Sequence, residues 1–167
     1  MRVLLLDNNV LVHLIEELYY DDNQSFYKVL SQLALEYREF WIPKTVQNEF
    51  LRGRHKKKLA RRLQRLKKMD LPVIKICPVP VARHETQVLV KSRDKDIGEA
   101  EAILQMTKAR DHEKYGHHEF VFCSRDKQAL QLAEKMQLEI LPYGILKNRM
   151  MEVGIKIPWH SKYRSGA

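Results

Sequence analysis

Five short runs of apolar residues recur along this chain, and sequence with helical periodicity fills the intervals between them. Strands that are apolar throughout, instead of alternating with polar residues, are typical of a parallel sheet that is buried on both faces. Strands that alternate with helices predict an α/β fold, with helices on both faces of a central, mostly parallel five-stranded sheet in a three-layer α/β/α arrangement. The predicted strands are residues 2–6, 39–42, 73–77, 119–123 and 138–141.

The predicted helices connect these strands. Residues 9–20 and 23–37 show two helical patterns, separated by Asp and Asn residues that suit a turn and a helix cap. Pro43 begins the next helix and Gly53 ends it. The remaining helices are predicted within residues 52–68, 82–93, 96–109, 124–136 and 145–152.

The length of 167 residues suits one hydrophobic core and is short for two. We therefore predict one domain over residues 1–157 and a basic, loosely ordered tail over residues 158–167. No apolar run reaches the roughly 18 residues of a membrane-spanning helix, and Asp7 interrupts the first run where a signal peptide would continue. The sequence thus predicts a cytoplasmic protein without a membrane partner.

The positive charge of the chain is concentrated in one stretch. Ten of the 30 Lys and Arg residues lie within residues 52–68, which hold no Asp or Glu, and removing them from the net charge of +9 leaves −1. Leucines at helical spacing predict an apolar stripe that packs inward, with the cations turned toward water. Such a helix suits a polyanion, such as a nucleic acid; a merely solvated helix face is the alternative. The residues predicted to bind this polyanion are Arg52, Arg54, Lys57, Lys58, Arg61, Arg62, Arg65 and Lys68.

A carboxylate stands directly after the first predicted strand. Asp7 follows the run VLLL, and a strand buried on both faces has no place for a charge. The carboxyl end of a parallel strand, in contrast, points into the crevice where α/β proteins bind their ligands. Asp126 follows the fourth predicted strand in the same way. Both are candidate site residues, although an Asp here can also simply cap the following helix.

Two further acidic segments accompany these aspartates. Glu49 lies on the helix after the second strand, and Glu99 and Glu101 lie at the start of the helix after Gly98. Carboxylates that gather in one crevice repel one another, and hard divalent cations such as Mg²⁺ or Mn²⁺ relieve that repulsion. Position in the sequence therefore predicts a metal site, while a solvated helix face is the alternative for each glutamate taken alone.

Other chemistries lack their motifs. The six glycines never fall at the spacing of a dinucleotide-binding or nucleotide-binding loop, and no G-x-S-x-G marks a hydrolase nucleophile. A phosphoaspartyl enzyme would need a second Asp where Asn9 stands. Histidine pairs can cleave RNA without metal, but His112, His117 and His118 lie in a polar loop that we expect to be solvated.

The acidic motifs resemble those of the PIN domain, a family of Mg²⁺- or Mn²⁺-dependent nucleases. The similarity rests on LLLDNNVLV, TVQNEF, GEAEAI and CSRD, and it covers residues 1–157. It implies a five-stranded parallel sheet and hydrolysis of RNA phosphodiester bonds. Residue by residue, the metal-binding carboxylates are matched by Asp7, Glu49, Glu99 and Asp126, with Glu101 as second choice for the third position, and the supporting polar residues by Asn9 and Ser124.

The same resemblance implies partners. Many small PIN proteins are toxins of toxin–antitoxin pairs, so a homodimer and a small antitoxin-like protein are expected. The predicted function is a metal-dependent endoribonuclease, in such a pair or outside one. A non-catalytic RNA-binding or partner-binding module with the same fold is the alternative, and DNA stays open as a substrate.

Overall fold

The computed structural model describes residues 1–18, 23–52, 56–70, 72–93 and 97–153. Within them, five strands form one all-parallel sheet in the order β3-β2-β1-β4-β5. The predicted α/β fold is confirmed, and each strand begins within one residue of its predicted position. The strands are β1 (Arg2–Leu6), β2 (Glu39–Ile42), β3 (Val73–Ile76), β4 (Glu119–Ser124) and β5 (Glu139–Pro142).

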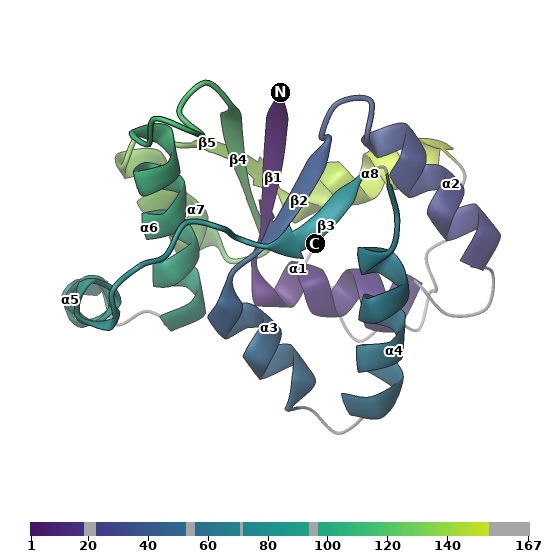
Figure 1. Cartoon of the computed structure of the whole chain (residues 1–167), viewed down its shortest axis with the longest axis horizontal. Coiled ribbons are helices and arrows are strands. Elements are labelled where there is room, and N and C mark those ends of the chain that lie inside the picture. The colour runs from purple at the N-terminus through teal and green to yellow at the C-terminus, as the bar shows by residue number, and fades with distance from the viewer. Residues whose placement is uncertain (19–22, 53–55, 71, 94–96, 154–167) are drawn as a thin grey trace.

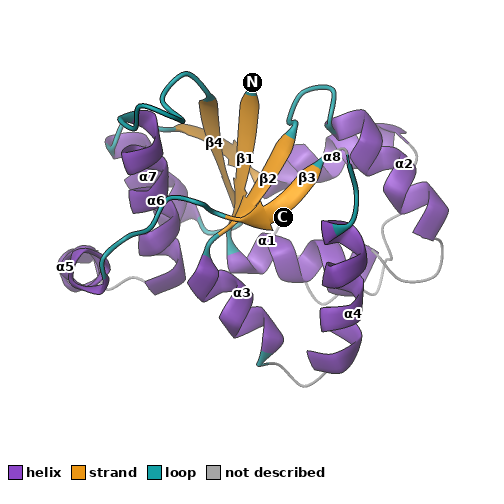
Figure 2. Ribbon diagram, in the orientation of Figure 1, coloured by secondary structure: helices purple, strands orange, loops and turns teal. Residues whose placement is uncertain are grey.

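Helices connect the strands and cover both faces of the sheet (Figure 1), as Figure 2 shows by secondary structure. They are α1 (Asn8–Val12), the π-helix η1 (His13–Leu18), α2 (Asn23–Leu33), α3 (Lys44–Leu51), α4 (Lys56–Lys67), α5 (Arg83–Arg93), α6 (Ile97–Arg110), α7 (Lys127–Lys135) and α8 (Tyr143–Val153). Among the described residues, no helix combines the length and the apolar character that a membrane crossing needs. The predicted tail, residues 158–167, lies outside the described residues.

One predicted helix is divided in the structure, a second is shorter than predicted, and α8 begins at Tyr143, two residues before its predicted start. The helix predicted over residues 9–20 is divided into α1 and the wider turn of η1, which apolar spacing does not distinguish from an α-helix. The second predicted helix ends at Leu33 because the following N–H groups, of Leu35 and Glu36, bond to carbonyls three residues back and tighten the last turn.

Side chains of the central strand alternate between two hydrophobic layers. Leu4 and Leu6 pack with α1, η1, α2, α4 and α8, on what we call the α8 face of the sheet. Val3 and Leu5 pack with α6 and α7, on the α6 face. All four side chains are at most 1% exposed, and burying each contributes roughly 1.5–3 kcal/mol. A charge is therefore excluded from the strand itself and can stand only at its end.

The two cysteines of the chain, Cys77 and Cys123, are buried free thiols. Cys77 ends the strand-like run of β3, and burial raises the pKa of its thiol to about 12. Burial, followed by the charge of Asp7, raises the pKa of the Cys123 thiol still further. Neither thiol is therefore ionised at neutral pH.

Candidate functional site

Asp7 and Ser124 lie side by side where the two central strands end. The ladder between β1 and β4 continues past its last pair, Leu6 and Cys123, because the Asp7 N–H donates to the Cys123 carbonyl at 3.1 Å. The Ser124 hydroxyl donates to Oδ2 of Asp7 at 2.7 Å. Alternation along both strands directs these two side chains to the α6 face.

The Asp7 side chain is a buried carboxylate, in a residue that is only 3% exposed. Burying a charge is unfavourable unless hydrogen bonds compensate for the lost water. The bond from Ser124 supplies one such contact, and a hydrogen bond to a charged group contributes roughly 1.5–3 kcal/mol. The backbone carbonyl of Asp7 also accepts from the Leu11 N–H at 3.0 Å, so the same residue leads into α1.

Ser124 also contacts the second aspartate. Its Oγ accepts a hydrogen bond from the Asp126 N–H at 3.0 Å, so one hydroxyl connects the Asp7 side chain with the Asp126 backbone. Oδ1 of Asp126 accepts from the N–H groups of Gln128 at 2.8 Å and Ala129 at 3.3 Å, which makes Asp126 the N-cap of α7. The capping alternative is therefore correct for Asp126. The cap holds the carboxylate at the end of β4 and is compatible with a second role.

Asn9 joins the same two segments. Its Oδ1 accepts from the Arg125 N–H at 3.2 Å, which connects α1 with the turn between β4 and α7. Asn9 and Ser124, the two residues expected to support the aspartates, thus both bridge the segments that carry Asp7 and Asp126.

Glu99 lies in the first turn of α6 and is 7% exposed. Ile103 and Met106 follow it on the same side of the helix and are fully buried in the α6 face, as is Ala102 nearby. Ala102 and Ile103 thus pack inward from the helix that carries Glu99. Because α6 runs opposite to the strands, its first turn lies at the level of their carboxyl ends (Figure 1).

Glu101 points to a different side of α6 and is bonded to α3. Its carboxylate accepts from the Thr45 N–H at 3.4 Å and from the Thr45 hydroxyl, and the Gln105 amide donates to it at 3.4 Å. These contacts fix the first turn of α3 against α6. Glu101 therefore serves helix packing, which leaves Glu99 as the better candidate for the third acidic position.

The fourth candidate, Glu49, lies on α3 one turn after Thr45, and its side chain is outside the described part of the structure. Among the side chains that are described, no three His, Cys, Asp or Glu residues gather closely enough to hold a metal ion. The observed arrangement is thus two aspartates joined by Ser124, with Glu99 on a neighbouring helix. The predicted metal site stays a prediction.

The α8 face of this edge holds a cluster that the sequence analysis missed. The rings of His13 and Tyr143, 0% and 1% exposed, meet edge to face with their centres 4.8 Å apart. The Arg125 guanidinium lies 5.9 Å from the centre of the Tyr143 ring. Burial, and then the charges of Arg125 and Lys147, lower the pKa of His13 to about 4, so it is neutral at neutral pH. The sequence feature that could have revealed this cluster is His13, a histidine on an otherwise apolar helix face.

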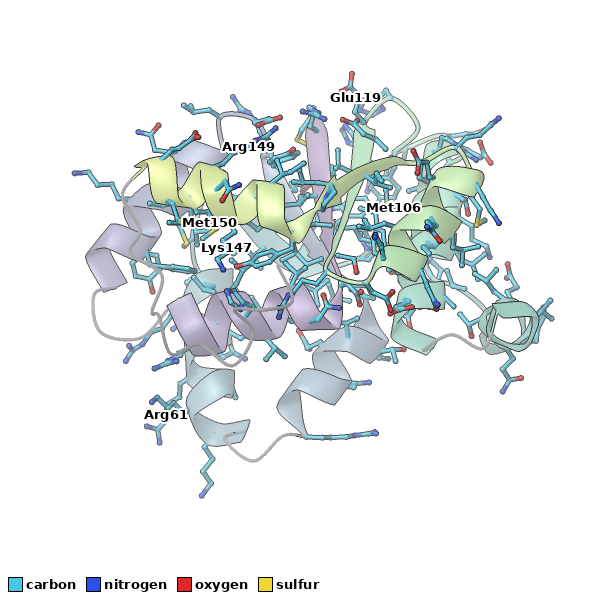
Figure 3. The ribbon with its side chains drawn as sticks, turned by 180° about the vertical axis from the view of Figure 1, so that it is seen from behind. Arg61, Met106, Glu119, Lys147, Arg149 and Met150 are labelled. Atoms are coloured by element: carbon cyan, nitrogen blue, oxygen red, sulfur yellow. The ribbon has the colours of Figure 1, made fainter. Side chains whose placement is uncertain are left out.

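Helix α4 divides its cations between packing and solvent. Leu63 and Leu66 are buried as predicted. Arg62 differs from the prediction that it faces water, because it is half-buried and donates to the Ile15 carbonyl of η1 at 2.9 Å. Figure 3 shows Arg61 pointing outward from α4. Arg52 is also exposed, and Arg54 lies outside the described residues. We define the α4 stripe as the exposed cations Lys57, Lys58, Arg61, Arg65 and Lys68.

The histidine loop lies at the opposite edge of the sheet. His118 directly precedes β4, whereas Asp126 follows its carboxyl end, and six strand residues span about 20 Å. His112 and His117 are exposed, as expected for a solvated loop, and the centres of the His117 and His118 rings are 4.0 Å apart. These histidines therefore cannot act on the same phosphate as the two aspartates.

No protein-family model matches this chain, and no curated protein matches it significantly. The resemblance to the PIN domain rests on the acidic motifs, and the observed α/β fold agrees with it.

Proposed function

We propose that this protein is a metal-dependent endoribonuclease of the PIN type. The observation that supports this most is the connection made by Ser124, which holds the buried Asp7 carboxylate and the Asp126 backbone together. A buried carboxylate is unfavourable for folding, and the carboxyl edge of a parallel sheet is where α/β proteins bind ligands. A functional role for Asp7 accounts for both facts.

The candidate donors suit Mg²⁺ or Mn²⁺. Carboxylate oxygens are the ligands that these hard cations prefer. In this proposal, Asp7 and Asp126 hold the cation, and Glu99 and Glu49 complete the set. When bound, the cation supplies an activated water for attack on phosphorus and stabilises the charge on the departing 3′-oxygen.

The remaining contacts orient these carboxylates. Ser124 restricts the rotation of the Asp7 side chain, and the helix cap restricts that of Asp126. The bonds between Glu101 and Thr45 set the spacing of α6 and α3, which carry Glu99 and Glu49. Such fixed geometry is what a metal site requires from the groups around its ligands.

The α4 stripe is proposed to bind the RNA backbone. Lys57, Arg61, Arg65 and Lys68 follow one another at intervals of one helical turn, so they line one side of the helix over about 17 Å. A row of exposed cations attracts a polyanion and releases its counterions, which makes binding depend strongly on salt.

Cleavage of end-labelled single-stranded and structured RNAs, with Mn²⁺, with Mg²⁺ and with EDTA, tests the nuclease proposal. Wild type is expected to cut only with metal. Asp126→Asn should lose more than about 100-fold in rate, since losing even an outer partner of a metal ligand costs roughly 10- to 100-fold. Asn caps a helix as well as Asp does, so this variant should keep its stability, whereas Asp126→Ala should lose about 1 kcal/mol as well.

The controls separate the two roles of Asp126. Asp7→Asn should also lose cleavage, and Lys135→Ala, an exposed change on α7, should not. Wild-type rates in both aspartate variants would contradict the proposal. RNA binding without cleavage in every condition would favour the non-catalytic RNA-binding module. The same assay with DNA of matching sequence decides between the two nucleic acids.

The proposed role of the α4 stripe is tested by Lys57→Ala/Arg61→Ala/Arg65→Ala. On single-stranded RNA this variant should flatten the slope of log K against log salt by about 2, at about 0.7 for each lost phosphate contact. Arg62→Ala should instead reduce stability, because Arg62 holds η1. An unchanged slope in the triple variant would mean that α4 presents a solvated face that does not bind RNA.

The partners implied by the resemblance extend this proposal. Light scattering on the purified protein tests the expected homodimer. Inhibition of cleavage by a small co-expressed protein would test the expected antitoxin.

A further inference from the structure

Two cations, Arg125 and Lys147, lie on the α8 face of the carboxyl edge, the edge that carries the two aspartates. Arg125 stands between Ser124 and Asp126, and Asn9 holds its N–H at 3.2 Å. Its guanidinium lies 5.9 Å from the ring centre of Tyr143, which belongs to the hydrophobic layer of the α8 face. Consecutive residues of one turn therefore present a hydroxyl to one face of the sheet and a guanidinium to the other.

Lys147 supplies the second cation. It follows Tyr143 by one turn of α8, so the two side chains share one side of the helix. Figure 3 shows Lys147 and Arg149 leaving α8 on opposite sides, with Lys147 directed toward η1. Arg149 bonds to Glu36 and Tyr37 near the amino edge, whereas Lys147 and Arg125 both bring positive charge to His13. The side chains of Arg125 and Lys147 are both partly exposed.

Buried rings support the pair. His13 and Tyr143 are in edge-to-face contact, and burial keeps both rings uncharged: it disfavours the imidazolium of His13 and the phenolate of Tyr143. The face of an aromatic ring attracts a guanidinium, which holds Arg125 in place at little entropic cost on binding. The Arg125 guanidinium is thus oriented before any ligand arrives.

We propose that Arg125 and Lys147 form a phosphate-binding site for an RNA phosphate that flanks the scissile one. That the ligand is RNA rests on the proposed function. A planar guanidinium suits two phosphate oxygens at once, and an ammonium adds a point charge. RNA that crosses the carboxyl edge would place one phosphate at Asp7 and Asp126 and a neighbouring phosphate at the cation pair. These cations also offset the repulsion between RNA and the carboxylates.

Binding measured without cleavage tests this site. The probe is a fluorescein-labelled oligouridylate, titrated in EDTA at a series of salt concentrations with protein in an Asp126→Asn background. Arg125→Ala/Lys147→Ala should raise Kd about tenfold and flatten the slope of log K against log salt by about 1.4, at about 0.7 per lost contact. Arg125→Lys should keep the slope and lose only part of the affinity, because it keeps the charge but not the planar fork.

The matched control is Lys28→Ala/Lys135→Ala, which removes two exposed lysines from α2 and α7. It should leave Kd within about twofold and the slope unchanged. If the Arg125 and Lys147 double variant behaves like this control, the inference is overturned, whatever the cleavage assay shows. If its slope flattens while wild type cuts no RNA, the phosphate site stands and the nuclease proposal fails.

Thermal unfolding of each variant checks that the fold is intact. Where the double variant unfolds, the single variants Arg125→Gln and Lys147→Gln decide. Each should flatten the salt slope by about 0.7, and wild-type slopes in both would overturn the inference.

Discussion

At the amino edge of the sheet three glutamates share one arginine, whereas at the carboxyl edge two aspartates share one serine. Arg2 forms ion pairs with Glu36, Glu119 and Glu139, which come from the turn after α2 and from the first residues of β4 and β5. Figure 3 shows Glu119 at this edge. Asp7 instead accepts from the hydroxyl of Ser124. At the amino edge, the positive charge of Arg2 therefore offsets the negative charge of the glutamates, and these ion pairs join β1 to β4 and β5. The charged residues of this edge thus serve packing.

Neutral donors act differently at the carboxyl edge. A hydroxyl or a backbone N–H orients a carboxylate without cancelling its charge, whereas a guanidinium does both. The donors described for Asp7 and Asp126, a hydroxyl and two backbone N–H groups, therefore orient these carboxylates without adding positive charge. The comparison predicts that the two edges respond to different perturbations: pH and loss of a hydroxyl for the carboxyl edge, salt for the amino edge.

The largest expected effect is a loss of stability in mild acid, and it originates beside the carboxyl edge. The pKa of His13 falls from an ordinary 6.5 to about 4 in the folded protein. Between these values the unfolded chain binds a proton that the folded chain does not, so the free energy of unfolding decreases as the pH falls from 6.5 to 4. The full contribution is about 3 kcal/mol.

Urea denaturation at a series of pH values measures this contribution. His13→Phe cannot be protonated, so its stability should fall by about 3 kcal/mol less than that of wild type over the same pH range. If both proteins lose the same amount, His13 is not the group that responds, and the carboxyl edge has no special sensitivity to pH.

A somewhat smaller effect is expected from Ser124→Ala. Removing a hydrogen bond to a buried carboxylate should cost roughly 1.5–3 kcal/mol, and losing the support of both aspartates should slow cleavage roughly 10- to 100-fold. Ser31→Ala is a matched control, since Ser31 also donates one hydrogen bond, to the Tyr27 carbonyl, but on the exposed side of α2. Full cleavage activity in Ser124→Ala would contradict the comparison, because Ser124 is the residue that the two aspartates share.

The smallest effect is expected at the amino edge. Arg2→Met keeps the aliphatic part of the side chain and removes the ion pairs, which should reduce stability by about 1 kcal/mol at low salt. The difference from wild type should shrink at high salt, because screening weakens the pairs of the wild-type protein. Cleavage should be unchanged. Slower cleavage in Arg2→Met at undiminished stability would mean that the two edges are coupled.

Much of this edge could be predicted because its signals are local. An apolar run fixes a buried strand, and a carboxylate directly after it, as at Asp7, or two residues after it, as at Asp126, lies at the end of that strand. The capping role of Asp126 is local as well, since its partners are two and three residues away. Short-range patterns therefore gave the fold class, the strand ends and the candidate aspartates.

The remaining contacts depend on partners far away in the sequence. Arg62 bonds to Ile15 across 47 positions, and Glu101 bonds to Thr45 across 56. Helical periodicity assigns a side chain to the apolar or the polar side of its own helix, but the neighbouring element decides whether a polar side chain meets water or a carbonyl. The cluster of Tyr143 and Arg125 was missed for the same reason.

The central position of β1 in the sheet has a consequence for how the protein is made. β1 leaves the ribosome long before its neighbour β4, which begins only at Glu119. At about 5–20 residues per second, synthesis needs roughly 6–20 s to deliver that neighbour. During this interval one side of an apolar strand has no pairing partner, and Asp7 and Asp126 cannot meet. A nascent chain therefore carries a segment that chaperones can recognise, and the two aspartates come together only after most of the chain has been translated.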